Sequence, residues 1–248
     1  MTGRLIGVGV GPGDPELLTI KALRILREAD VVFVPVAAVP EPPQAVHVEL
    51  GRAEAVVLAH VDPAHVVRLP FALSDDEALR CGNWERAGGL VARALYAGQV
   101  AVFATIGDPA VYSTFTYLAA TVRSLVPGVA IEAVPGITAM QELAARCGVS
   151  LVEGTEGLTL VPFTAGINQL RAGLEHGETI VCYKGGRHLP EILNLLAECG
   201  RLDQAVYGAR LGLADERVCP ARDMLGTSGP YLSTLIVPSK RTGMGSKR

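Results

Sequence analysis

The tripeptide Gly-Asp-Pro occurs twice in this sequence, at residues 13–15 and 107–109. Each copy follows an apolar run and precedes a segment with helical spacing, so both copies are expected to begin a helix. An aspartate accepts hydrogen bonds from the free amides of a first helical turn, and proline fits the position after it. The same free amides can bind a carboxylate or a phosphate. These turns are therefore the places where the chain could bind an anionic group.

Glycines crowd the first turn, and they would let a ligand approach the backbone closely. They stand at Gly7, Gly9, Gly11 and Gly13. Their spacing departs from the dinucleotide-binding fingerprint, because its third glycine would fall on Pro12 or Asp14. The sequence also lacks the Gly-Lys-Ser or Gly-Lys-Thr of a phosphate-binding loop. A nicotinamide-dependent oxidoreductase, with Asp30 binding the ribose, is left as an alternative.

The elements that must position these turns alternate between strand and helix. Apolar strand-like runs cover residues 4–10, 31–36, 100–106 and 130–137. Helical spacing covers 16–30, 75–98, 110–126 and 138–148, and the segment 53–61 fits either state. In the helix expected at 110–126, Tyr112, Phe115 and Leu118 fall at core spacing. This alternation predicts a largely parallel α/β sheet.

After residue 157 the pattern changes. Strands are expected at 158–163, 178–184, 204–212 and 231–237, with helices at 167–177 and 189–200. We therefore predict an N-terminal α/β domain over 1–157, a C-terminal α/β domain over 158–240 and a basic, flexible tail over 241–248.

The composition argues against several classes of protein. With 49% hydrophobic residues, 19% charged residues and a net charge of -3, the chain resembles neither a disordered protein nor a nucleic-acid-binding one. It has no apolar run long enough to span a membrane and no recognisable signal peptide. The cysteines form no Cys-x-x-Cys pair and the histidines no paired metal motif. These features predict a cytoplasmic protein with reduced thiols, no protein-bound metal, and no nucleic-acid or membrane partner.

Four ordered segments of the chain resemble the tetrapyrrole methylases. They are "VGVGPGDPELLTIKALRILREADVV", "ATIGDPAVYST", "VPGIT" and "YLSTLIV". Members of that family use S-adenosylmethionine, and they have two α/β domains with the cofactor in the cleft between them. The resemblance implies this fold, this methyl donor, a small tetrapyrrole substrate and a homodimer for the present chain.

Within the family, the segments "GRLIGVGVGPGDPELLTIKA", "GRAEAVVLAHV" and "YKGGRHLPEIL" resemble the C20-methyltransferases of cobalamin synthesis. Uroporphyrinogen-III methylases typically have a second glycine where this chain has Ile106, and methionine where it has Lys184. The resemblance thus implies methylation of precorrin-2 at C20 to give precorrin-3A. Because no metal-ligand constellation appears in the sequence, we expect a preference for the metal-free ring. The cobalt-bearing substrate (cobalt-factor II) and methylation at another ring carbon are the alternatives.

The resemblance also assigns cofactor contacts, and the backbone around Gly107 is expected to face the methionine part of S-adenosylmethionine. The contacts are Pro12, Ile106, Gly107, Asp108, Val111, Thr138, Ala139, Lys184 and Val206. The substrate carries carboxylate arms, which basic side chains in loop-like segments could bind. The candidates are Arg52, Arg187 and His188, although ordinary surface charges would look the same.

Methyl transfer of this kind asks little of side chains. A sulfonium methyl is already activated and C20 of a reduced tetrapyrrole is electron-rich, so alignment of the two supplies much of the rate. A base is needed to remove the C20 proton, and Tyr112, Asp108 and Glu153 are candidates. The alternative roles for these residues are a core aromatic, a helix cap and a surface acid, respectively.

Overall fold

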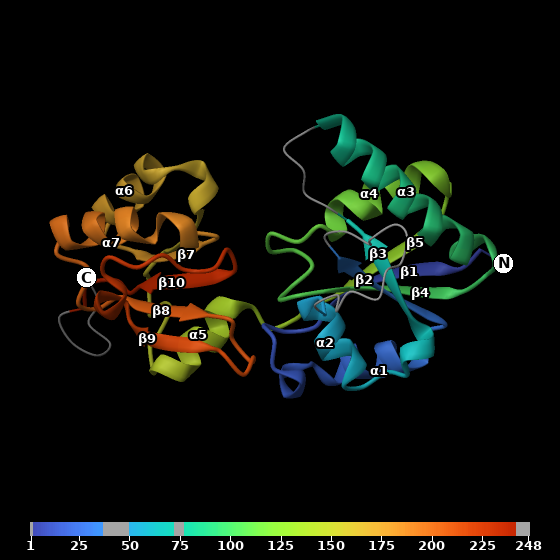
Figure 1. Ribbon diagram of the computed structural model, residues 1–248, viewed down its shortest axis with the longest axis horizontal. Helices are drawn as coiled ribbons and strands as arrows, with labels where there is room; N and C mark the ends of the chain where they lie inside the picture. The colour runs from blue at the N-terminus through green and yellow to red at the C-terminus, as the bar shows by residue number, and fades with distance from the viewer. Residues whose placement is uncertain (1, 37–49, 72–76, 242–248) are drawn as a thin grey trace. The chain divides into compact units, whose positions relative to one another are not determined.

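The computed structural model describes residues 2–36, 50–71 and 77–241, and the chain divides into two compact units, Met1–Thr138 and Ala139–Arg248 (Figure 1). Each unit contains a five-stranded sheet with helices packed against it. The prediction of two α/β domains is therefore confirmed. Among the described residues, no helix is both long enough and apolar enough to cross a membrane.

The first sheet is parallel throughout, as the alternation predicted. Its strands are β1 (Arg4–Gly9), β2 (Val31–Val36), β3 (Val66–Pro70), β4 (Val100–Thr105) and β5 (Ala130–Val134), in the order β3-β2-β4-β1-β5. Its helices are α1 (Ile20–Glu28), α2 (Arg52–Leu58), α3 (Glu77–Tyr96) and α4 (Phe115–Leu125). The segment that fitted either state is thus mostly the helix α2.

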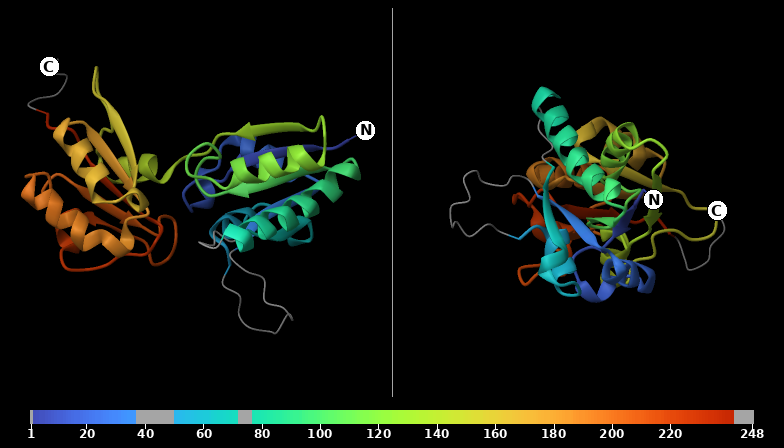
Figure 2. Two further views of the ribbon diagram at one scale, coloured as in Figure 1. Left: turned by 90° about the horizontal axis from the view of Figure 1, so that it is seen from above. Right: turned by 90° about the vertical axis from the view of Figure 1, so that its right-hand side faces the viewer.

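Helices cover both faces of the first sheet. Residues of α1 and α2, such as Leu26 and Val57, form one apolar cluster with the sheet, and residues of α3 and α4, such as Leu95 and Leu118, form another. Figure 2, seen from above, shows α3 and α4 lying over the strands. Strands buried on both faces have no polar side to alternate with, which explains their continuous apolar runs.

The second sheet is mixed. Its strands are β6 (Leu158–Pro162), β7 (Thr179–Tyr183), β8 (Val206–Ala209), β9 (Arg217–Pro220) and β10 (Ser233–Val237), in the order β6-β7-β10-β8-β9. Only β6 and β7 pair in parallel, and β10 runs antiparallel to both β7 and β8. The helices α6 (Ile167–Glu175) and α7 (Leu189–Glu198) pack on one face, and α5 (Ala139–Cys147) packs on the other. The short strand β9 was not predicted, because its four residues show no apolar run.

The division between the units differs from the expected boundary at 157/158. It falls between Thr138 and Ala139, because α5 belongs to the second unit. Leu143 and Ala144 of this helix are buried in one cluster with Val181 and Ile236 of the second sheet. Sequence spacing revealed the helix, but it could not reveal which sheet the helix covers.

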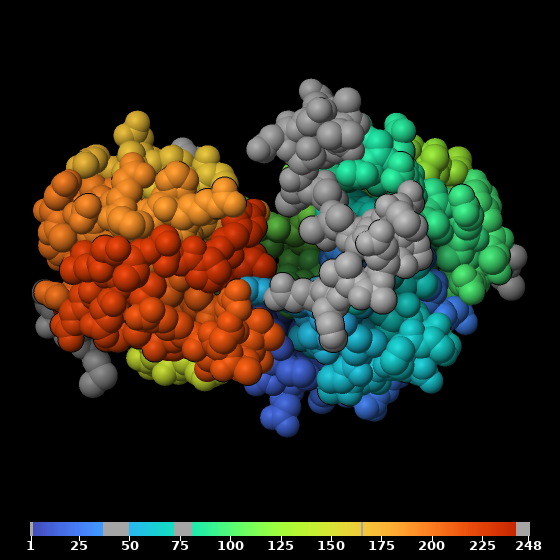
Figure 3. Space-filling model, in the orientation of Figure 1, coloured from blue at the N-terminus to red at the C-terminus, as the bar shows by residue number. Residues whose placement is uncertain are grey.

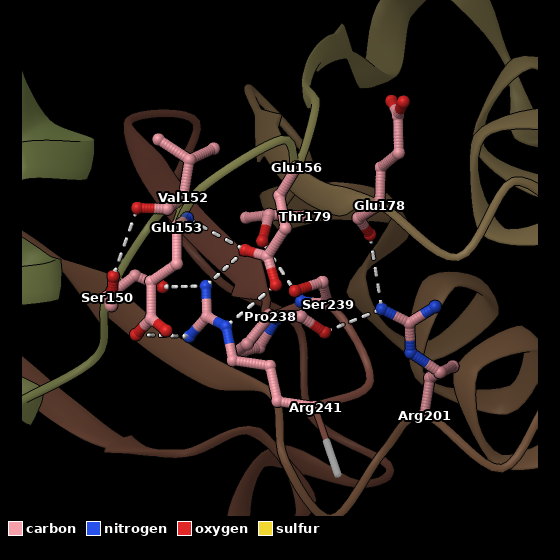
Figure 4. A network of polar contacts seen from close by, with 10 residues as sticks. All are labelled: Ser150, Val152, Glu153, Glu156, Glu178, Thr179, Arg201, Pro238, Ser239 and Arg241. Atoms are coloured by element: carbon pink, nitrogen blue, oxygen red, sulfur yellow. Dashed lines mark hydrogen bonds and ion pairs between the residues drawn. The ribbon is translucent and has the colours of Figure 1, made fainter. Parts of the chain in front are cut away.

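The segment after β10 is held to the rest of the second unit by a polar network (Figure 4). Arg241 donates from Nε and Nη2 to the Glu156 carboxylate at 2.9 and 2.6 Å, and from Nη2 to the Ser150 carbonyl at 3.2 Å. Its Nη1 lies 3.7 Å from the Glu153 carboxylate. The expected flexible tail therefore does not include Arg241, and residues 242–248 lie outside the described part of the chain.

Candidate functional site

Three loops meet through their backbones at the carboxyl ends of β4, β1 and β5. A Cβ atom built on Gly9 would lie 2.5 Å from the Gly107 carbonyl oxygen and 2.7 Å from the Gly136 Cα. A Cβ on Gly136 would lie 2.8 Å from the Cα of Gly9. No side chain fits at such distances, so the glycines allow three neighbouring strand ends to converge.

Hydrogen bonds fix this convergence. The Gly107 amide donates to the Gly11 carbonyl at 2.7 Å, which joins the loops after β4 and β1. The Asp108 carboxylate accepts from the Ala110 amide at 2.7 Å and, through its other oxygen, from the Gly136 amide at 3.0 Å. Asp108 therefore connects the loop after β4 to the loop after β5. This second contact could not be predicted from the sequence, because its partner lies in another loop.

The second Gly-Asp-Pro turn does not begin a helix, so that prediction is wrong. Residues 107–109 form a turn, and α4 begins only at Phe115, whose amide donates to the Ser113 hydroxyl at 3.1 Å. Asp108 is thus a loop-to-loop connector rather than the expected helix cap. Its geometry is decided by the neighbouring glycine loop, which local sequence cannot describe.

The first copy begins only a short 3₁₀ helix. Asp14 accepts a hydrogen bond from the Glu16 amide at 2.8 Å and caps the turn Pro15–Leu17. The helix α1 starts at Ile20 and has its own cap, Thr19. Aspartate and proline therefore perform the predicted capping here, although the main helix begins after a second turn.

The converging loops lie where the connections between strands change direction across the first sheet, between the adjacent strands β1 and β4. After β1 the chain passes into α1 on one face, and after β4 it passes into α4 on the other face. The two loops diverge from adjacent strands, and in open α/β sheets ligands bind in the crevice outside such a switch point. This edge of the first unit is therefore a candidate binding site.

Most of the predicted cofactor contacts of the first unit lie at this edge. Pro12 and Thr138 are buried there, and Ile106 and Val111 are half-buried. Gly107 has a φ of +70°, and a Cβ on it would find only the Thr138 Cα within 4 Å, at 4.0 Å. A side chain at Gly107 would thus meet open space, and the role of Gly107 as a cofactor contact stays a prediction.

Tyr112 is not a core residue, which corrects one of the two roles considered for it. It lies in the loop before α4 with a φ of +50° and is 42% exposed, whereas Phe115 and Leu118 are buried as expected. Nearby, the hydroxyls of Thr105 and Ser113 are hydrogen-bonded at 2.9 Å. This polar pair at the end of β4 was missed, although both residues lie within the conspicuous segment "ATIGDPAVYST".

The second-unit contacts predicted at Lys184 and Val206 lie at opposite ends of their strands. Val206 begins β8 in the row of Ile236 and Val181, and it packs on the cluster beneath α5. Lys184 follows β7, three residues beyond Val181 and therefore about 10 Å further along the strand. Ala139, also predicted as a contact, is the half-buried first residue of α5.

The basic candidates for substrate binding occupy separate places. Arg52 is the first residue of α2, close to the end of β2, since a Cβ on the preceding glycine would lie 3.3 Å from the Pro35 carbonyl oxygen. Arg187 and His188 are exposed in the 3₁₀ turn that follows β7. The imidazole of His188 lies 5.0 Å from the Phe163 ring.

Two acidic residues have structural partners. Glu153, a candidate base, lies 3.7 Å from Arg241 in the second unit. Asp30, considered for a ribose, stands before β2 and accepts a hydrogen bond from the Val100 amide at 2.7 Å. It therefore lies at the amino end of the strands, opposite the candidate site. Asp30 is thus too far from that site to bind the ribose of a nicotinamide cofactor there, which argues against the nicotinamide alternative.

The environments of Cys182 and Cys147 do not favour a role as reactive thiols. Burial raises the pKa of Cys182 to about 12, and burial followed by the nearby Cys219 raises the pKa of Cys147. Both thiols are protonated at neutral pH and are poor nucleophiles. Within the described ranges, no three His, Cys, Asp or Glu side chains gather in a way that could hold a metal ion.

Comparisons with known proteins agree on one family. The model of the Tetrapyrrole (Corrin/Porphyrin) Methylases matches residues 4–223. Precorrin-2 C(20)-methyltransferase of a Sinorhizobium species is 35% identical over 95% of both chains. Cobalt-precorrin-2 C(20)-methyltransferase of Salmonella typhimurium is 26% identical over 96% of this chain and 97% of its own.

The solved structure of uroporphyrin-III C-methyltransferase from Thermus thermophilus with S-adenosylhomocysteine is also similar. It is 25% identical, its TM-score is 0.63, and the match covers 94% of this chain and 97% of the other. The matches in sequence and in structure extend over both units and include the converging glycine loops. The chain therefore belongs to the tetrapyrrole (corrin/porphyrin) methylases.

Proposed function

We propose that this protein transfers a methyl group from S-adenosylmethionine to C20 of precorrin-2, giving precorrin-3A in cobalamin biosynthesis. The observation that carries the proposal is the 35% identity to a precorrin-2 C(20)-methyltransferase over 95% of both chains. A related uroporphyrin-III C-methyltransferase was solved with S-adenosylhomocysteine, which supports the choice of methyl donor.

The proposed cofactor site lies at the carboxyl ends of β1, β4 and β5 in the first sheet. Its loops offer backbone amides and carbonyls, and the open space at Gly107 would admit the methionine part of S-adenosylmethionine. Bound there, the cofactor supplies an electrophilic methyl group. Pro12, Ile106 and Thr138 would line the space around the bound cofactor. Asp108 would keep the loops after β4 and β5 joined through its hydrogen bond with the Gly136 amide. Val111, Ala139, Lys184 and Val206 are proposed contacts that rest on the family resemblance.

Among the candidate bases, the contacts favour Tyr112. Both carboxylate oxygens of Asp108 accept backbone hydrogen bonds, so its role is to connect loops. Glu153 lies 3.7 Å from the Arg241 guanidinium, an ion pair that gives it a structural role in the second unit. Tyr112 is exposed at the edge of the candidate site, in a left-handed backbone conformation that often occurs at functional positions.

The direct test is turnover under anaerobic conditions with S-adenosylmethionine and either precorrin-2 or its cobalt complex. We expect one added methyl by mass spectrometry, located at C20 by NMR, and faster turnover of the metal-free ring. A methyl at another ring carbon would overturn the positional assignment. Faster turnover of the cobalt complex would favour the second candidate, a cobalt-precorrin-2 enzyme, to which the Salmonella relative points.

The resemblance further supports a homodimer that works in the cytoplasm. Reduced thiols persist in that compartment, and all five cysteines are free. Neither property is needed for the assignment of the reaction.

A further inference from the structure

The loop between β4 and α4 is fixed at both of its ends. At the first end, the Asp108 carboxylate accepts a hydrogen bond from the Ala110 amide at 2.7 Å. At the second end, the Ser113 hydroxyl accepts a hydrogen bond from the Phe115 amide at 3.1 Å. Tyr112 lies between these two ends, so its backbone is restrained from both sides.

A buried threonine connects the second end of the loop to the sheet. Thr105 is the last residue of β4, and its hydroxyl is hydrogen-bonded to that of Ser113 at 2.9 Å. The Thr105 carbonyl accepts from the Val10 amide at 2.9 Å, and Thr105 pairs with Gly9 of β1. The Thr105–Ser113 hydroxyl pair therefore ties the loop to the two strands that border the candidate site.

Packing fixes the residue that follows this pair. Phe115 is the buried first residue of α4, and its ring occupies the space that a side chain at Gly7 would need, since a Cβ there would lie 2.5 Å from the ring. The Phe115 ring also stacks on Phe103, with 6.0 Å between the ring centres. The start of α4 thus has little freedom to move against the sheet, and the hydroxyl pair inherits that rigidity.

The restrained residue, Tyr112, has an unusual backbone and an exposed ring. Its φ is +50° and it is 42% exposed, whereas Ser113 and Thr114 on its C-terminal side are half-buried. Green atoms of this stretch of the chain are visible at the surface in Figure 3. Side chains rarely adopt a positive φ, and such strain persists only where surrounding contacts enforce it. The hydrogen bonds at the two ends of the loop are contacts of that kind.

We infer that Thr105 and Ser113 are positioning residues that act through Tyr112, and that their hydroxyl pair keeps its phenol at the edge of the candidate site. The inference rests on the proposed function, in which Tyr112 is the favoured base. As a phenolate, Tyr112 would take the C20 proton while the bonding electrons return to the methylated ring. Proton transfer requires hydrogen-bond reach, so a displaced phenol would slow this step.

The test compares three threonine variants of the full-length protein. Thr105→Val removes the hydroxyl and keeps the branched shape, whereas Thr105→Ser keeps the hydroxyl. Thr179→Val is the matched control, because the Thr179 hydroxyl is also buried and accepts a hydrogen bond from the Ser239 amide at 2.9 Å in the second unit. Thermal unfolding of each variant measures the stability cost of losing a buried hydroxyl.

With precorrin-2 as substrate, Thr105→Val should lower kcat about tenfold, because alignment is lost at the reacting group. Its KM and its affinity for S-adenosylhomocysteine, measured by calorimetry, should stay at wild-type values. Thr105→Ser should restore kcat, and Thr179→Val should lose stability without losing kcat. Equal kcat values for Thr105→Val and Thr179→Val would overturn the inference.

A double-mutant cycle tests whether Thr105 acts through Tyr112. Tyr112→Phe should lower kcat about a hundredfold, as expected for loss of a general base. Adding Thr105→Val to Tyr112→Phe should lower kcat no further, because residues that act as one unit are not additive. A further tenfold loss in the double variant would show that Thr105 acts independently of Tyr112.

Fluorine NMR tests the positioning without turnover. The six tyrosines are replaced with 3-fluorotyrosine, and the Tyr112 resonance is the one missing from Tyr112→Phe. Thr105→Val should shift or broaden this resonance, whereas Thr179→Val should leave it unchanged. An unchanged resonance in Thr105→Val would contradict the positioning role. Absence of wild-type turnover with precorrin-2 would contradict the proposed function alone, because the resonance reports on the loop without catalysis.

Discussion

At the scale of single residues, the site is defined by what glycine permits and by what one aspartate connects. Gly9 and Gly136 let three loops approach at distances that exclude a Cβ atom, whereas a Cβ on Gly107 would meet open space. Asp108 then joins two of these loops with one carboxylate oxygen for each. The open space at Gly107 and the hydrogen bonds of Asp108 therefore make separate predictions, one about ligand binding and one about stability.

Gly107→Val should abolish binding of S-adenosylhomocysteine, because its side chain would enter the proposed ligand space. The φ of +70° also strains any side chain, by about 1–2 kcal/mol. Gly128→Val is the matched control, since Gly128 has a φ of +76°, has open space around it and precedes β5 at the opposite edge. Calorimetry and thermal unfolding separate the two effects. If Gly107→Val bound S-adenosylhomocysteine with wild-type affinity, the turn would have no role in cofactor binding.

Asp108→Ala should destabilise the protein by about 2 kcal/mol, because two backbone amides lose a charged acceptor. Asp14→Ala, which removes one exposed hydrogen bond, should cost only about 1 kcal/mol. Urea unfolding measures both values. Equal losses in the two variants would mean that the contact with Gly136 contributes nothing to stability.

At the scale of elements, the second unit is closed by contacts between its first and last segments. Glu156 lies just before β6, and its carboxylate forms an ion pair with Arg241, which follows β10 (Figure 4). Arg201 adds hydrogen bonds from Nη2 to the carbonyls of Pro238 at 2.6 Å and Glu178 at 3.2 Å. These contacts join segments far apart in the sequence, and they predict a pH dependence.

The Arg241 guanidinium, followed by the Ser239 hydroxyl, lowers the pKa of Glu156 from 4.5 to about 2. A lowered folded-state pKa means that this stabilisation is fully present above about pH 4.5 and is lost as the pH falls toward 2. Glu156→Gln should therefore reduce the slope of unfolding free energy against pH in that window. Arg241→Leu should have the same effect, and an unchanged slope in both variants would contradict the assignment.

At the scale of the whole molecule, the two sheets differ in construction. The first sheet is parallel and has a switch point between β1 and β4, whereas the second sheet is mixed. The proposed function includes a homodimer, which is an expectation from the family resemblance. Light scattering at micromolar concentration should therefore give about twice the chain mass of 26.0 kDa. A monomer mass would remove the homodimer from the proposal.

The sequence by itself determined the α/β class, most of the elements and the identity of the conspicuous turns, because these depend on local periodicity and on glycine and proline. The tertiary structure decided which partners those residues meet. Asp108 was predicted as a helix cap but contacts Gly136, and α5 joined the second sheet through Leu143. Val206 lies in one row with Ile236 and Val181 through the register of β10, which no local pattern encodes. Contacts of this kind depend on strand order and on packing between segments far apart in the sequence. Local periodicity and turn residues therefore cannot predict them.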